Sequence, residues 1–154
     1  MTGKIRIDPK FFDLVIYGVY YAIYDLIGEN TWSIVWKCGE IVFEEAKNFI
    51  EELRDKDPFK VLSTLAKWLK DSGYVEDISV EKISNDTVKY IMLNPAIADG
   101  AQKLIKLGRV PAHISTSLMF AALKSLGYTA KMVGGPEFLS DGRVVEYWKL
   151  YKLN

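Results

Sequence analysis

The side chains best suited to chemistry lie together in one short segment. His113 is the only histidine of the chain, and Ser115, Thr116 and Ser117 follow it almost directly. An imidazole can carry a proton near neutral pH, and hydroxyls in the first turn of a helix can bind a polar head group or cap the helix. Two interpretations therefore stay open. His113 is either a polar anchor or proton donor at the mouth of a pocket, or a loop or cap residue on the surface. The three hydroxyls either bind a ligand head group or cap the helix, and capping is favoured.

Cys38 is the only cysteine, so neither an internal disulfide nor a cysteine-based zinc site is possible within the chain. Its thiol is either a nucleophile or acylation site, or a small buried apolar residue. Nucleophilic chemistry requires an activating base, and none is identifiable in the sequence. The sequence therefore favours a buried, inert Cys38.

Other chemical motifs are weak, and we expect no cofactor and no metal. The segment Gly134-Gly135-Pro136 lacks the lysine and the following helix of a phosphate-binding loop, so it predicts a turn or bulge. Four glutamates are expected on a solvated helix face, and without a histidine or aspartate cluster they make a poor metal site: Glu44, Glu45, Glu51 and Glu52. An enzymatic function ranks last among the hypotheses.

Composition sets the broad class of protein. The 154 residues predict a single domain, residues 1–154, and 20 basic against 20 acidic residues leave no positive excess to attract nucleic acid. The longest uncharged apolar run, Leu14 to Tyr24, is about half of what a bilayer requires. We therefore expect a cytoplasmic protein without a transmembrane segment.

Hydrophobic periodicity predicts three helices in the first half of the chain. The first follows Asp8-Pro9, runs to Ile27 and is apolar nearly all round, and Gly28 ends it. The second is capped by Asn30 or Thr31 and runs to about Leu53, with Gly39 inside it. A glycine there costs about 1 kcal/mol against alanine, which close packing against a neighbour would explain. The third begins at Asp57-Pro58, after a very short turn.

The second half predicts a mixed pattern. Residues 75–83 and 87–93 form a hairpin, two short helices cover residues 98–107 and 114–126, and residues 128–133 and 143–151 form a last pair of strands. The helix from Ile114 to Leu126 is too apolar to be exposed and must be covered on all sides. This order of elements predicts an α+β fold, with an antiparallel four-stranded sheet covered by helices.

Two stretches carry a family resemblance. They are GENTWSIVWKCGEIVFEEA and GRVPAHISTSLMFAALKSLGYTAKMV, with a glycine within a long helix, a proline loop, an apolar helix and a Leu-Gly stop. Over residues 10–152 the chain resembles the vinyl-4-reductase-like (small-molecule, hydrocarbon-binding) domain. That domain shares its fold superfamily with the TRAPP transport-particle subunits and has a TRAPP/NO-signalling-like ligand-binding fold. The resemblance implies an apolar cavity and a homodimer.

The chain also departs from that family. Many members carry several cysteines in the C-terminal half, whereas residues 77–154 of this chain have none. No metal or redox role tied to those cysteines can be carried over, and Cys38 does not sit where the acylated cysteine of the TRAPP relatives is expected.

Three hypotheses follow, in this order: a binding module for a small hydrophobic molecule such as a hydrocarbon, lipid or pigment; a dimeric scaffold without ligand; and a reductase-like enzyme. For the first, we expect an apolar cavity between the helices and the sheet, with His113 and Ser115 at its polar end. The predicted apolar lining is Val15, Val19, Ile23, Val35, Val42, Leu118 and Ala122. Four tyrosines on one helix face predict an interface between subunits, with the lining of a pocket for a flat apolar ligand as the alternative, and both can hold: Tyr17, Tyr20, Tyr21 and Tyr24.

Overall fold

The computed structural model describes residues 5–154, and the chain forms two compact units. Unit 1 joins the chain up to Trp32 with Ala96–Ala112, and unit 2 joins Ser33–Pro95 with His113–Asn154. The prediction of one domain stays a prediction. Each unit is described below by itself.

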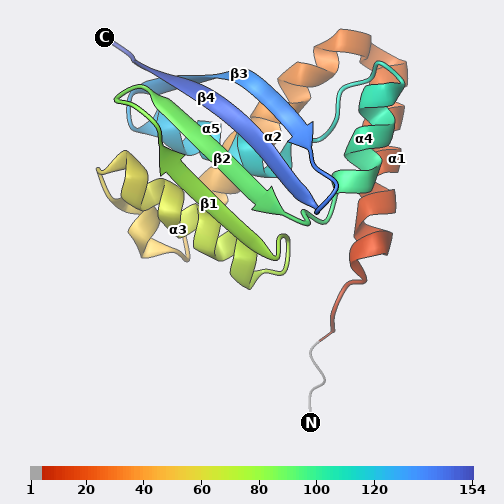
Figure 1. Ribbon diagram of the computed structural model, residues 1–154, viewed down its shortest axis with the longest axis horizontal. Helices are drawn as coiled ribbons and strands as arrows, with labels where there is room; N and C mark the ends of the chain where they lie inside the picture. Colours follow the sequence, from red (N-terminus) through yellow and green to blue (C-terminus); the bar gives the residue numbers. More distant parts are fainter. Residues whose placement is uncertain (1–4) are drawn as a thin grey trace. The chain divides into compact units, whose positions relative to one another are not determined.

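The helices and strands follow the predicted order (Figure 1). The four strands form one antiparallel sheet, which confirms the α+β class and the four-stranded antiparallel sheet. Within residues 5–154 the elements are α1 Pro9–Ile27, the 3-10 helix η1 Gly28–Asn30, α2 Thr31–Ala46, the 3-10 helix η2 Glu51–Arg54, α3 Pro58–Asp71, β1 Asp77–Lys82, β2 Thr87–Leu93, α4 Ala98–Lys106, α5 Ile114–Ser125, β3 Tyr128–Phe138 and β4 Arg143–Lys152.

Helix α2 ends earlier than its periodicity predicts. It stops at Ala46 rather than near Leu53, and in the turn that follows the Ala46 carbonyl accepts bonds from the amides of Phe49 and Ile50. The Arg54 guanidinium then donates to the carbonyl of Lys47 at 3.1 Å. The connection to α3 is therefore a folded segment that contains η2, and the very short turn predicted there is wrong.

In unit 1, α1 holds the start of α4. Asp8 caps α1 as predicted, with its carboxylate accepting from the amides of Lys10 and Phe11. Both carboxylate oxygens of the buried Asp13 accept from the Gly100 amide in the first turn of α4, at 3.1 and 3.2 Å. No side chain of α4's own N-cap makes that bond, so Asp13 caps α4 from another helix.

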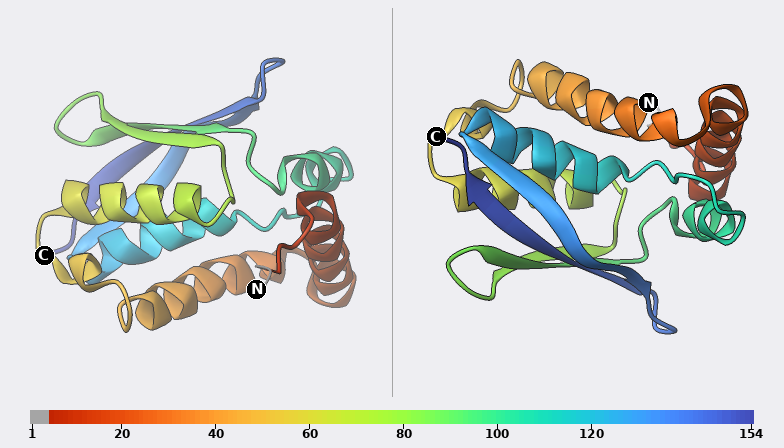
Figure 2. Two further views of the ribbon diagram at one scale, coloured as in Figure 1. Left: turned by 90° about the horizontal axis from the view of Figure 1, so that it is seen from below. Right: turned by 90° about the horizontal axis from the view of Figure 1, so that it is seen from above.

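In unit 2, the sheet has the strand order β1-β2-β4-β3. Figure 2 shows α3 and α5 on one face of this sheet, and no described helix of unit 2 lies on the other face. The core lies between these layers and includes the fully buried Val88, Tyr90 and Trp148 from the sheet and Leu118 and Met119 from α5. Gly134–Pro136 interrupts the pairing of β3 with β4, which confirms the predicted bulge.

Helix α5 is covered on two sides inside unit 2. The sheet lies against one side, and α2 lies beyond the other (Figure 2). A Cβ at Gly39 would lie 2.8 Å from the Cβ of Ser117 and would overlap the Ser117 carbonyl group. The predicted close packing at Gly39 is therefore confirmed. In contrast, nothing lies within 4 Å of a Cβ at Gly18, so no helix packs closely against this position within the described residues.

One helical stretch meets the length and composition of a membrane span. Among residues 5–154 this stretch is Pro9–Ala46, which covers α1, η1 and α2. Only 11 % of its most apolar part is buried in this structure. The core helices of soluble proteins and signal sequences can have the same length and composition. The expected absence of a transmembrane segment stays an expectation.

The Gly39 contact predicts a large effect from a single methyl group. Gly39→Ala should lower the free energy of unfolding by about 2 kcal/mol, because α2 and α5 must separate to admit it. Urea unfolding followed by circular dichroism measures the change. Gly18→Ala is the matched control: it lies in an exposed helix position with free space and should raise stability by about 0.5–1 kcal/mol. Equal effects at the two positions would contradict the packing argument.

Candidate functional site

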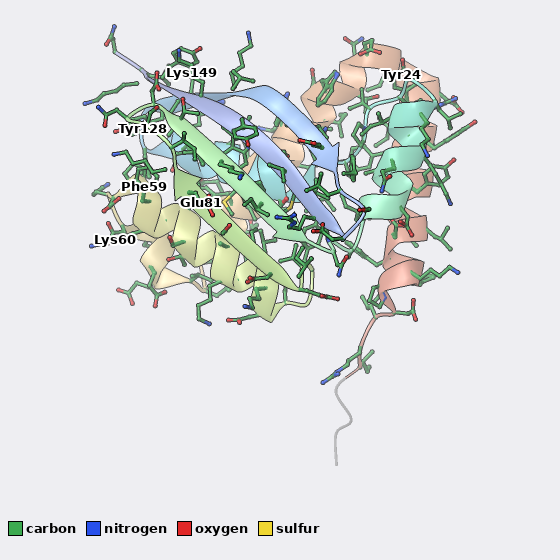
Figure 3. The ribbon with its side chains drawn as sticks, viewed as in Figure 1. Tyr24, Phe59, Lys60, Glu81, Tyr128 and Lys149 are labelled. Atoms are coloured by element: carbon green, nitrogen blue, oxygen red, sulfur yellow. The ribbon has the colours of Figure 1, made fainter. Side chains whose placement is uncertain are left out.

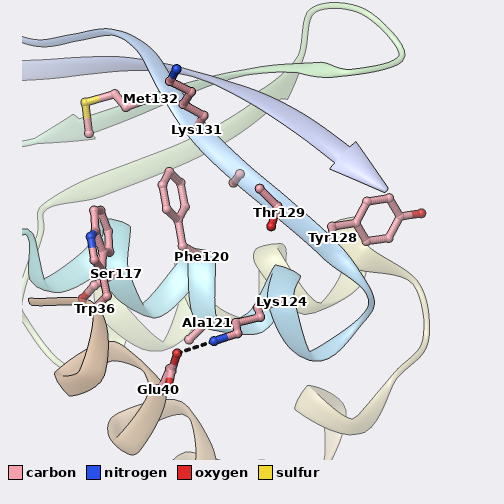
Figure 4. Close-up of a pocket in the computed structure, with 11 residues that line it drawn as sticks. Trp36, Glu40, Ser117, Phe120, Ala121, Lys124, Tyr128, Thr129, Lys131 and Met132 are labelled. Atoms are coloured by element: carbon pink, nitrogen blue, oxygen red, sulfur yellow. Dashed lines mark hydrogen bonds and ion pairs between the residues drawn. The ribbon is translucent and has the colours of Figure 1, made fainter. Parts of the chain in front are cut away.

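Unit 2 contains an open groove between α2, α5 and β3 (Figure 4). Its volume is about 450 Å³, within the range of ligand pockets, and its surface is mainly apolar. The lining residues are Trp36 and Glu40 from α2, Ser117, Phe120, Ala121 and Lys124 from α5, and Tyr128, Thr129, Ala130, Lys131 and Met132 from β3.

Aromatic rings form the firm wall of the groove. Trp36 stacks on Phe120 with ring centroids 5.5 Å apart and planes 11° apart. Phe120 in turn meets the buried Trp148 edge to face at 5.1 Å. The Trp148 ring lies 4.4 Å from that of Tyr90. This chain of contacts fixes the groove wall to the core of the sheet, so the wall is preformed.

An ion pair closes one end of the groove. The Lys124 ammonium donates to the Glu40 carboxylate at 2.7 Å, which links α5 to α2 (Figure 4). This bond and the charge of Lys124 lower the pKa of Glu40. The groove thus has an apolar middle and a charged end, an arrangement suited to a ligand with one polar group.

A buried carboxyl group of the sheet faces helix α5. Glu146 on β4 is 1 % exposed, and the Thr116 hydroxyl lies 2.5 and 2.8 Å from its two oxygens. The Trp148 indole N–H donates to it at 3.3 Å. Burial raises the pKa of Glu146, although these hydrogen bonds oppose the shift. The carboxyl group links α5 to the sheet. Its burial costs more free energy when it is ionised than when it is protonated.

The hydroxyls of the 115–117 segment do not cap α5. Ser115 donates to the Met92 sulfur at 3.0 Å, Thr116 bonds Glu146, and Ser117 donates back to the carbonyl of Ile114 at 3.1 Å. The capping prediction is therefore wrong, because all three side chains are buried and find partners inside unit 2.

His113 occupies the N-cap position of α5 but does not cap it with its side chain. Its backbone is left-handed, with φ 46° and ψ 44°, and its carbonyl accepts from the Ser117 amide. Burial lowers the pKa of His113 to about 4, so the imidazole is neutral at pH 7. The alternative of a loop or cap residue is confirmed in its cap position, although the side chain is half-buried rather than fully exposed. A role at the mouth of a pocket stays a prediction, and His113 is not among the residues that line the groove.

The predicted apolar lining does not come together in the groove. In unit 2, Val35, Leu118 and Ala122 are fully buried, whereas Val42 is exposed. In unit 1, Val15 and Val19 are exposed and Ile23 is half-buried. Their predicted contact with a ligand stays a prediction.

The tyrosine face of α1 is largely used inside unit 1. Tyr20 is buried, and Tyr17, Tyr21 and Tyr24 are half-buried. The Arg109 guanidinium lies 3.8 Å from the Tyr21 ring centroid, and the Tyr24 hydroxyl donates to Glu29. The predicted role of these tyrosines between subunits stays a prediction.

Cys38 is exposed, so the prediction that it is buried is wrong. Val35, Gly39 and Phe43 take the inward side of α2, and this leaves Cys38 outward. The four glutamates Glu44, Glu45, Glu51 and Glu52 are exposed as predicted, and residues 5–154 hold no group of three metal-binding side chains.

Sequence reasoning missed the residues that shape the site. The sequence pattern singles out none of Trp36, Phe120 and Glu146. One signal for Glu146 exists in the sequence: on a strand it shares the parity of Val144 and Trp148, and both of those are buried.

Comparison with known proteins shows the fold. No family model and no curated protein matches the chain. Among solved structures, a subunit 3 of the trafficking protein particle complex from Naegleria fowleri, covalently bound to palmitic acid, superposes with a TM-score of 0.59 at 16% identity. The match covers 95% of this chain and 97% of that one. An H-NOX family protein, studied for heme distortion, gives 0.61 at 12% identity over 100% and 77%. The chain therefore has the H-NOX/TRAPP-like fold.

The buried Glu146 predicts a pH-dependent difference between wild type and Glu146→Gln. The raised pKa means that the folded protein holds a proton that the unfolded chain has lost, so the wild type loses stability as pH rises above about 4.5. Glutamine keeps the acceptor for Thr116 and carries no charge. The variant should gain stability over wild type from pH 5 to pH 8, by about 1 kcal/mol or more.

Urea unfolding of both proteins across this pH range measures the difference. His113 titrates in the opposite sense, with its stabilising effect lost as pH falls from 6.5 towards 4, but it is present in both proteins and cancels. A stability difference that stays constant with pH would contradict a raised pKa.

Proposed function

We propose that this chain is a non-catalytic binding module for a small hydrophobic molecule, of the vinyl-4-reductase-like kind that its sequence resembles. The observation that carries the proposal is the groove with its preformed aromatic wall of Trp36 and Phe120. The fold relatives support it, since one of them is bound to palmitic acid and another contains heme. A ligand would bind largely by burial, at about 25 cal/mol per Å² of apolar area.

Heme itself is not carried over to this chain. The groove lining contains no histidine and no cysteine, and the sole histidine, His113, lies outside it. The acyl bond of the TRAPP relative is not carried over either. Cys38 lies outside the groove lining, so a ligand in the groove has no thiol to react with.

A neutral apolar dye, N-phenyl-1-naphthylamine, tests the groove by fluorescence titration. Ala130→Trp should weaken dye binding at least about tenfold, which corresponds to about 1.4 kcal/mol, because the added indole fills the space beside Phe120. Phe49→Ala is the control, since Phe49 is an exposed aromatic residue outside the groove. Equal affinity for wild type and Ala130→Trp would overturn the assignment to this groove. Native mass spectrometry of the purified chain checks for a ligand that copurifies with it.

A second candidate function, a dimeric scaffold, is favoured by a separate observation on α1. One side of this helix is an exposed apolar stripe without a basic residue. It also includes Gly18, which has no side-chain carbon, and Ala22, which has only a methyl group, so its centre is flat. Two such faces would be complementary to each other about a twofold axis. The exposed apolar residues are Phe11, Leu14, Val15, Val19 and Leu26.

Sedimentation velocity tests self-association through this stripe. The wild type should sediment as a dimer and Val15→Glu as a monomer, because a carboxylate would be buried in the centre of the interface. Since Val15 is exposed within the chain, the substitution should leave its fold intact. Lys10→Glu, a charge change at another exposed position of α1, should remain dimeric. A monomeric wild type would contradict this candidate.

A further inference from the structure

The outer edge of β3 is a strand edge with an apolar groove beside it. In the order β1-β2-β4-β3, β3 pairs with β4 on one side and has no strand on the other within residues 5–154. The backbone N–H and C=O groups on that side therefore lack strand partners, and an added strand could pair with them.

The groove follows this edge. Every residue from Tyr128 to Met132 lines it. Successive side chains of a strand point to opposite faces, so only a groove that runs along the backbone edge can touch all of them. The bulge at Gly134–Pro136 ends the regular edge, which leaves Tyr128–Val133 as the length available for pairing.

The inner side of this edge suits apolar side chains. Ala130 and Met132 are half-buried on the helix-facing side of β3, and Trp36 and Phe120 form the opposite wall of the groove (Figure 4). A strand lying in the groove would direct every second side chain against these rings.

The outer side of the same edge suits an acidic side chain. Lys131 and Lys149 are register partners on β3 and β4, so two like charges lie directly opposite each other on the exposed face of the sheet. Figure 3 marks Lys149 on β4. Lys149 lies 3.6 Å from Asp86, whereas Lys131 takes part in none of the ion pairs among residues 5–154. A carboxylate on the free side of Lys131 would offset this repulsion.

We propose that β3 binds an extended peptide by strand addition, with alternate apolar side chains in the groove and an acidic side chain opposite Lys131. This partner goes beyond the small-molecule ligand of the proposed function and uses the same groove wall. Main-chain hydrogen bonds along Tyr128–Val133 supply affinity, and the apolar and acidic positions supply selectivity.

Peptides as long as Tyr128–Val133 test the proposal by isothermal titration calorimetry. The probe is acetyl-Val-Thr-Val-Glu-Val-Thr-amide, and two derivatives carry N-methyl groups either on the three valines or on the other three residues. The amides of alternate residues point to opposite edges of a strand, so one derivative should lose binding and the other should keep it. Binding of both derivatives, or binding of none of the three peptides, overturns strand addition.

A charge exchange tests the acidic position. Lys131→Glu should weaken binding of the probe by about threefold or more and should strengthen binding of the same peptide with lysine in place of glutamate. Lys89→Glu is the matched control, because Lys89 lies on the same face of the sheet but on the inner strand β2. Equal effects of the two substitutions overturn the placement of the peptide beside Lys131.

The dye titration separates this proposal from the function on which it builds. The affinity for N-phenyl-1-naphthylamine is measured beside that for the peptide, and Lys89→Glu, whose side chain does not line the groove, should leave the dye affinity unchanged. Displacement of the dye by the peptide supports a shared groove. Dye binding without peptide binding overturns strand addition alone, and loss of both overturns the groove itself.

Discussion

The closeness of α2 to α5 at Gly39 is the constraint on which unit 2 depends. Helix α5 is apolar along its length, and the sheet can cover only one of its sides. Cover for another side comes from α2, and the backbones approach so closely at Ser117 that no Cβ fits at position 39. The cost of a glycine within a helix, about 1 kcal/mol, is offset by the apolar surface that this contact removes from water.

The same contact also determines where the groove lies. Trp36 and Glu40 flank Gly39 on α2, and Phe120 and Lys124 follow Ser117 by one and two turns on α5. Once Gly39 rests on Ser117, the two side-chain pairs meet, as a ring stack and as an ion pair. Beyond them, β3 has no strand on its outer side within the described residues. The space between α2 and this edge of the sheet therefore remains open as the groove.

Burial acts on two ionisable groups near the first turn of α5, Glu146 and His113. It raises the pKa of Glu146 and lowers that of His113, so the neutral form of each group is favoured. Neither group lines the groove. This part of unit 2 is better suited to holding α5 against the sheet than to acid–base chemistry, in agreement with a binding module.

The sequence alone determined the helices and strands, and it did so through local rules. Asp8-Pro9 and Asp57-Pro58 start helices because both aspartates can cap them, and alternation in residues 87–93 predicts a strand at its observed bounds. It also determined that the 114–126 helix must be covered and that Gly39 needs a close neighbour. These inferences depend only on periodicity and on the properties of single residues.

Only the tertiary structure decided which side chains share a site. The groove joins residues from Trp36 to Met132, and periodicity carries no information on which apolar faces meet. For this reason Val35, Leu118 and Ala122 were expected around a ligand but lie in the packed interior. Likewise, Thr116 and Glu146 are distant in sequence, and only the sheet register and the position of α5 bring their side chains together.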